Sequence, residues 1–190
     1  MNLATAEDAS PLAALHTAVA DDLTGRYGKG HWSSPVSEKS VLAGMRTSKV
    51  FVARDNSGVI IATLRLTTKK PWAIDKSYFT ECRKPLYLHS MAVAPELQHQ
   101  GIGRLCIEEV KRIGREWPGD AIRLDAYDAE AGAGGFYRKC GFQEVGRVIY
   151  RSTPLIYFEM LLGGMMAPMN PSSPVQGANS RSSREVISCM

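Results

Sequence analysis

Apolar and polar positions recur every three to four residues in several stretches of the chain, the spacing of amphipathic helices. The first stretch follows Thr5 and Asp8, which form a capping-box variant, and predicts a helix that ends near Leu23. A second helix is expected over residues 37–46 and a third over residues 103–116, with one charged and one apolar face. The apolar face of the third helix is expected to contain Ile102, Leu105, Cys106, Val110, Ile113 and Trp117.

Short apolar runs bounded by turn residues predict the strands of a sheet. The run at residues 86–93 is apolar on both faces, as expected of an interior strand. Segment 68–85 is irregular and long for a loop without structure, and such loops are usually functional. The expected strands span residues 2–4, 49–55, 59–67, 86–93, 121–127, 142–151 and 155–162, with a short helix at 133–140. This order of elements predicts an α/β fold with a mixed sheet.

Composition bounds the organisation of the chain. Its 190 residues predict one domain over residues 1–163, followed by a tail at 164–190 whose Met, Pro, Ser, Asn and Gly content predicts disorder. The net charge of +4 suits an anionic ligand and does not indicate nucleic-acid binding. No apolar run approaches the roughly 18 residues of a membrane span. With no secretory signal and no paired cysteine motif, a reducing cytoplasm is the expected location.

The stretch from Leu86 to Arg104 combines a buried strand, a loop with two glycines and the start of a helix. A helix that begins in this way directs several free N–H groups, and the positive end of its dipole, to one point. That point favours an anion such as a phosphate. The dinucleotide-binding pattern G-x-G-x-x-G is excluded, because Cys106 stands where it needs a third glycine.

The spacing Gln98-x-x-Gly101-x-Gly103 after an apolar strand resembles motif A of the GNAT N-acetyltransferase superfamily. The run Phe136-Tyr137-Arg-Lys-Cys-Gly-Phe142 resembles motif B of the same superfamily, in the right order and one helix and one strand later. The resemblance covers about residues 2–162. It implies a mixed, mostly antiparallel central sheet with helices on both faces and a splayed pair of central strands.

The resemblance also implies a function, namely direct transfer of an acetyl group from acetyl-CoA to a primary amine. In such a site the backbone of residues 91–93 pairs with the pantetheine arm, the loop at 99–104 binds the pyrophosphate, and Tyr137 protonates the departing thiolate. The family's asparagine before the tyrosine helix is absent, and Asp128 is the residue available in its place. The implied cofactor-binding residues are Met91, Ala92, Val93, Gln98, His99, Gln100, Gly101, Ile102, Gly103, Arg104, Asp128 and Phe136.

His89 is the candidate base, because arylalkylamine acetyltransferases of this superfamily carry a histidine at the corresponding strand position. Strict alternation would place it on one face with Tyr87, Met91 and Val93. The four histidines lack metal-ligand spacing, so no metal is expected. The aromatic residues of the irregular segments are expected either to line the acceptor pocket or to belong to the core: Trp32, Trp72, Tyr78 and Phe79.

Other interpretations stay open at this point. Tyr137 could be a packed aromatic residue, and His89 a core histidine bonded to the backbone. The domain could bind acyl-CoA without turnover, as a regulatory module. A third alternative is an interaction protein that uses its basic surface, for instance on ribosomes. The acceptor amine cannot be read from the sequence, and neither can the formation of a homodimer.

Overall fold

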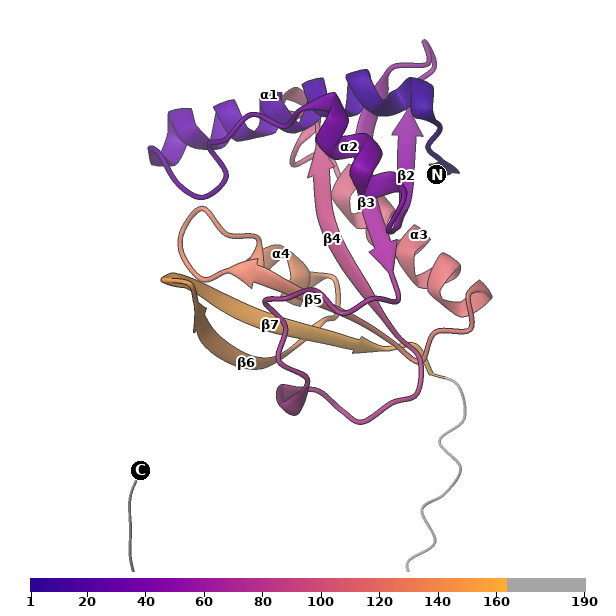
Figure 1. The fold of residues 1–190 in the computed structure, drawn as a ribbon, viewed down its shortest axis with the longest axis vertical. Coiled ribbons are helices and arrows are strands. Elements are labelled where there is room, and N and C mark those ends of the chain that lie inside the picture. Colours follow the sequence, from indigo (N-terminus) through magenta and orange to yellow (C-terminus); the bar gives the residue numbers. More distant parts are fainter. Residues whose placement is uncertain (164–190) are drawn as a thin grey trace, which may run out of the picture.

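A seven-stranded sheet organises the computed structural model, which describes residues 1–163 (Figure 1). The strands are β1 (Asn2–Leu3), β2 (Lys49–Arg54), β3 (Ile60–Thr67), β4 (Pro85–Val93), β5 (Ala121–Tyr127), β6 (Gln143–Tyr150) and β7 (Thr153–Leu161). The helices are α1 (Ala9–Tyr27), α2 (Glu38–Met45), α3 (Ile102–Glu116) and α4 (Gly134–Lys139), with short 3-10 turns η1 (Ala6–Asp8), η2 (Lys76–Tyr78) and η3 (Pro95–Leu97). The strand order is β1-β2-β3-β4-β5-β7-β6, and β4–β5 is the parallel pair among these antiparallel neighbours. The expected tail at 164–190 lies outside the described residues.

Helices cover both faces of the sheet. Apolar residues of α3 and α4 pack on one face in the main core, around Leu64, Leu124 and Phe158. On the other face α1 and α2 pack over β2 and the start of β3 in a second cluster. The buried residues of each cluster come from alternate positions of the strands, which is why one sheet supports two cores.

The ends of α1 follow from local chemistry. Its start is fixed by the Thr5 N–H, which donates to the Asp8 carboxylate at 3.0 Å. The helix continues past its predicted end near Leu23 and stops at Tyr27. Gly28 is the residue that leaves the helix with a positive φ of 77°, and its N–H closes the last turn on the Thr24 carbonyl at 2.9 Å.

The buried face of α3 differs from the predicted one at two positions. Leu105 is 69% exposed, whereas Ile107 is completely buried. The buried positions Cys106, Ile107, Val110 and Ile113 define a stripe that excludes residue 105. The prediction that Leu105 belongs to the core face is therefore wrong.

A bulge in β4 changes which side chains share a face. Ser90 has a φ of 51°, and the pairing with β3 shifts there from Arg65↔His89 to Thr63↔Ala92. The extra residue on β4 reverses the alternation beyond it. His89 therefore lies on the same face as Ala92, and the expectation that it shares a face with Val93 is wrong.

Strands β4 and β5 separate after a short paired segment. Their parallel pairing covers Pro85, Leu86 and Tyr87 of β4, and the two strands then diverge (Figure 1). The remainder of β4, from His89 to Val93, has no partner on its β5 side among the described residues. The predicted α/β class, with its mostly antiparallel sheet, helices on both faces and splayed central pair, is confirmed.

The irregular segment between β3 and β4 covers the α1 face of the sheet where β5 and β7 lie. Ile74 and Phe79 are buried there against Tyr87 and Tyr157. Phe79 thus belongs to a core, and Tyr78 packs edge-on to the Tyr157 ring. Trp72 is 88% exposed, so it does not belong to the core, and a place in the acceptor pocket stays a prediction.

Candidate functional site

The first turn of α3 presents free backbone donors. Gly101 precedes the helix with a φ of 86°, and His99 in the same loop has a φ of 62°. The helical bond nearest the start runs from the Leu105 N–H to the Gly101 carbonyl at 3.1 Å. The N–H groups of residues 102–104 therefore have no partner within the helix, and they lie at the positive end of its dipole. The free N–H groups expected at this helix start are present, and anion binding there stays a prediction.

The free edge of β4 faces the opening toward β5. The Ala94 N–H donates to the Ile61 carbonyl of β3 at 2.9 Å. The N–H and carbonyl of Val93, the preceding residue, therefore point away from β3. The Gln98 Nε2 donates to the Val93 carbonyl at 3.2 Å. Gln98 thereby ties the loop to the end of the strand and leaves the Val93 N–H directed at the opening.

The two predicted motifs meet at Gly103. A Cβ at this position would lie 3.2 Å from two ring atoms of Phe136 and 3.7 Å from the Met91 Cε. Gly103 thus permits α4 to pack closely against the start of α3 and the end of β4. A Cβ at Gly101 would have open space, so glycine is favoured there by its positive φ instead.

Tyr137 lies on α4 within an aromatic cluster. Its ring centroid is 5.2 Å from that of Phe136, 5.6 Å from Phe142 and 5.9 Å from Phe158. Burial, and next the negative charge of Asp125, raise the pKa of the Tyr137 phenol. The hydroxyl therefore keeps its proton at neutral pH, as a proton donor must.

His89 projects from β4 on the α1 face, opposite Arg65 of β3. Its Nδ1 lies 3.4 Å from the Ser90 Oγ. Burial, and next the positive charge of Arg65, lower the pKa of His89 to about 4. The imidazole is therefore neutral at pH 7 and free to accept a hydrogen bond or, weakly, a proton.

This low pKa makes folding sensitive to acid. Between pH 6.5 and about pH 4 the unfolded chain takes up a proton at His89 that the folded chain does not, so stability falls as the pH falls through this window. We expect His89→Gln to gain stability relative to wild type as the pH drops from 7.5 to 4.5, measured by urea unfolding at each pH. His16 and His31, whose pKa values are also lowered, remain in both proteins and cancel. A difference that stays constant with pH would contradict the assignment.

Two charged strand residues at the opening were not predicted. Asp125 lies on β5 two residues beyond the last β4–β5 pair, on the same face as His89, and burial raises the pKa of its carboxyl. Arg65 lies beside His89 on β3. The sequence carried a usable signal for Arg65, which is the single charge in its strand, whereas Asp125 shares its strand with Arg123.

An aromatic cluster stands next to Asp125. The His31 ring centroid lies 4.8 Å from that of Tyr127 and 5.0 Å from that of Trp32, and both contacts are edge-on. Trp32 is thus brought from the loop after α1 to the end of β5. Its indole Nε1 is buried without a hydrogen-bond partner among the described residues.

Two other predicted site residues, Asp128 and Gln100, have contacts of their own. Both carboxylate oxygens of Asp128 accept from the Arg147 Nη1, at 3.1 and 3.0 Å. The Gln100 Nε2 donates to the Glu96 carbonyl at 3.0 Å. Arg104 is exposed on the first turn of α3. Contact between Asp128 and a cofactor stays a prediction, and it would have to compete with the Arg147 ion pair.

Within residues 1–163, no group of three or more His, Cys, Asp or Glu side chains is arranged to hold a metal ion. No helix in this range is both long and apolar enough to cross a membrane.

One family model matches most of the chain. The family model described as "Acetyltransferase (GNAT) family" matches residues 15–142. A search of curated proteins gave no match. Among solved structures, an N-acetyltransferase from Staphylococcus aureus Mu50 is similar with a TM-score of 0.62 at 16% identity, over 85% of this chain and 97% of that one.

Two further structures show the same similarity. A ribosomal-protein-alanine N-acetyltransferase from Brucella melitensis has a TM-score of 0.63 at 18% identity, over 84% of this chain and 98% of that one. The protein yncA from Salmonella typhimurium, solved with acetyl-CoA, has a TM-score of 0.62 at 16% identity, over 88% of this chain and 95% of that one. At such identities the structural similarity establishes the fold.

Proposed function

The chain belongs to the GNAT family of acetyltransferases, and we propose that it moves an acetyl group from acetyl-CoA to a primary amine. The observation that carries this proposal is the position of the opening between β4 and β5. On one side are the free N–H groups of α3, and on the other is α4 with Tyr137. A long ligand with an anionic middle and a reactive end fits this order of groups.

The residues present suit the phosphates and the amide-bearing arm of acetyl-CoA. The N–H groups of residues 102–104 would bind the pyrophosphate, as anions bind at helix starts. The Val93 N–H and the free edge of β4 would pair with the arm as an added strand does. Phe136 and Met91, whose side chains both lie against Gly103, would border the arm.

The bound thioester supplies an activated acyl group. Tyr137 holds a proton for the sulfur that leaves as the new N–C bond forms, and the amine must lose a proton for that bond to form. His89, with a pKa of about 4, is a weak acceptor for a proton from an alkylammonium, whose pKa is about 10.4. We therefore assign His89 to orient the amine or a water that carries the proton away.

The test is release of the free CoA thiol from acetyl-CoA over a panel of primary amines. We expect at least one class of amine to raise release well above hydrolysis without amine. Acetyl-CoA at 100 times its Kd should also stabilise the fold by about 2.7 kcal/mol, seen as a rise in Tm. Stabilisation without turnover on any amine would favour the non-catalytic acyl-CoA module. The absence of both stabilisation and turnover would contradict the site.

A charge variant tests the anion site. Arg104 lies on the first turn of α3 and Arg115 on its last, and both are exposed. We expect Arg104→Gln to raise the Kd for acetyl-CoA roughly 3- to 10-fold, because it removes a charge-assisted contact to a phosphate. Arg115→Gln should leave the Kd unchanged. Calorimetric titration of both variants decides the point, and equal effects would place the phosphates elsewhere.

A further inference from the structure

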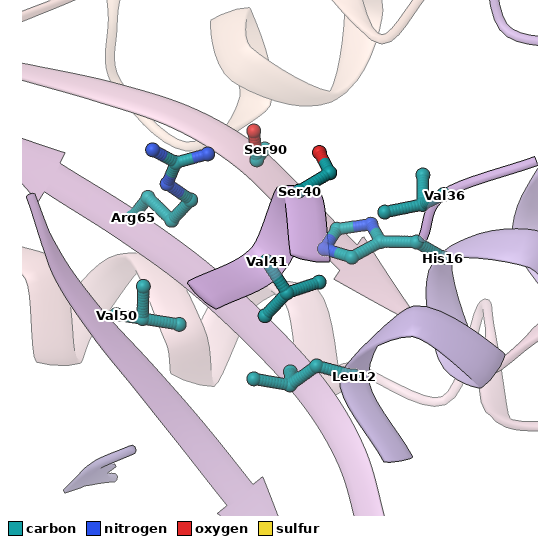
Figure 2. Close-up of a pocket in the computed structure, with 8 residues that line it drawn as sticks. All are labelled: Leu12, His16, Val36, Ser40, Val41, Val50, Arg65 and Ser90. Carbon is teal, nitrogen blue, oxygen red and sulfur yellow. The ribbon is translucent and has the colours of Figure 1, made fainter. Parts of the chain in front are cut away.

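A cavity of about 140 Å³ lies on the α1 and α2 face of the sheet, beside the bulge of β4 (Figure 2). Its lining is divided, with Leu12, Val41 and Val50 on one side of the view and the Arg65 guanidinium and two serine hydroxyls on the other. This volume holds several water molecules or one small polar group. The lining residues are Leu12, His16, Val36, Ser40, Val41, Val50, Arg65 and Ser90.

Arg65 brings a positive charge without an anionic partner to this cavity. Its Nε and Nη2 donate to the Ser48 Oγ at 3.0 and 2.9 Å, and none of the ion pairs within residues 1–163 includes it. The guanidinium lies flat on α2 at Gly44, where a Cβ would come within 2.7 Å of its Cζ. Burial lowers the pKa of Arg65, so the charge is kept at a desolvation cost that an anion would offset.

The charge at the cavity is limited to one unit. Burial, and next the charge of Arg65, lower the pKa of both His16 and His89, so these rings add no charge at neutral pH. The remaining polar groups of the lining are the hydroxyls of Ser40 and Ser90. One guanidinium with neutral hydroxyl donors suits a singly charged, planar carboxylate better than a phosphate dianion.

The cavity borders the place where the acceptor would sit. Arg65 is the register partner of His89, and Ser90 is the bulge residue from which the free edge of β4 continues. Across the opening, Asp125 stands on the same face of β5. The two sides of the opening thus carry opposite charges, a pattern complementary to a molecule with both an amine and a carboxylate.

We propose that the acceptor amine also carries a carboxylate, as an amino acid does, and that Arg65 binds this carboxylate in the cavity. This inference rests on the proposed function. Arg65 would determine specificity without taking part in proton transfer. The free Nη1 of its guanidinium, which donates no hydrogen bond to the described residues, is the available donor.

The experiment compares L-amino acids with their α-amides and their decarboxylated amines, as acceptors for wild type. We expect kcat/KM to be roughly 10- to 100-fold higher for the carboxylates, the range of a hydrogen bond to a charged group. Arg65→Gln should remove this preference mainly through KM, with a much larger loss on carboxylates than on amides. Arg65→Lys should keep part of the preference, and Arg115→Gln should keep all of it.

A second variant leaves the charge in place. Gly44→Ala displaces the guanidinium from α2, so it should weaken the carboxylate preference although Arg65 is intact. Thermal melting of each variant establishes that it is folded. Equal use of carboxylates and amides by wild type, or an equal loss on both in Arg65→Gln, would overturn the inference and leave the acetyltransferase proposal standing.

Binding separates this inference from the reaction. Calorimetric titration of the same amino acids and amides into the protein saturated with CoA needs no turnover. If no amine releases CoA, the proposed function fails, and binding that depends on both the carboxylate and Arg65 would still support the subsite. Carboxylates that bind no better than amides would overturn it.

Discussion

Tyr137→Phe is expected to lower kcat by about 100- to 10,000-fold, the usual contribution of a positioned general acid. The substitution removes one hydroxyl and leaves the ring among Phe136, Phe142 and Phe158, so the Tm should change little. The Kd for acetyl-CoA should also stay within about twofold, since the backbone and α3 bind it in our proposal. Thiol-release kinetics and calorimetry on the same samples measure both quantities.

The pH profile gives an independent check on Tyr137. Burial and the nearby Asp125 raise the pKa of its phenol above the ordinary value, so the proton is retained through neutral and mildly alkaline pH. Wild type should therefore lose no activity from this group below about pH 10. Tyr150→Phe, on β6, is the matched control and should be fully active. A kcat within threefold of wild type in Tyr137→Phe would mean that Tyr137 is a packed aromatic residue only.

The helices and the sheet could be predicted because local periodicity decides them. Ser37 caps α2 as its sequence suggests, since the Ser40 N–H donates to the Ser37 Oγ at 3.2 Å. The loop from Gln98 to Gly103 could also be predicted, because Gln98 and the two glycines lie within a few residues of the helix start that they shape. Leu105 was assigned to the buried face wrongly. For a residue at the edge of an apolar stripe, packing rather than spacing decides whether the side chain is buried.

Features that depend on distant residues could not be predicted. The bulge in β4 needs a positive φ at Ser90, which carries no glycine signal. It nevertheless decides that Ala92, and not Val93, shares the face of His89, on which Arg65 and Asp125 also lie. Arg65 and Asp125 come to border the same opening only through the order of the strands in the sheet. No local pattern in the sequence brings them together.

A buried ion pair beneath the irregular segment between β3 and β4 is a second such feature. The Arg123 Nε donates to the Glu159 Oε1 at 2.9 Å across the β5–β7 pair, and each side chain is 4% exposed. The Thr80 N–H donates to the Glu159 Oε2 at 3.2 Å, and the Thr80 carbonyl accepts from Arg123. The guanidinium also lies 4.9 Å from the Phe79 ring centroid. The pair thus ties the segment to the sheet.

Glu159→Gln is expected to lower the free energy of unfolding by about 3–5 kcal/mol, because it leaves the buried Arg123 charge uncompensated. The double variant Arg123→Met/Glu159→Leu should recover most of this loss, since it removes both charges and keeps similar volume. Urea unfolding at pH 7 measures each step. Glu116→Gln, which breaks the exposed pair with Arg112, should have little effect. A loss in Glu159→Gln no larger than in Glu116→Gln would contradict the stabilising role assigned to this buried pair, because the cost of breaking a pair depends on its removal from water.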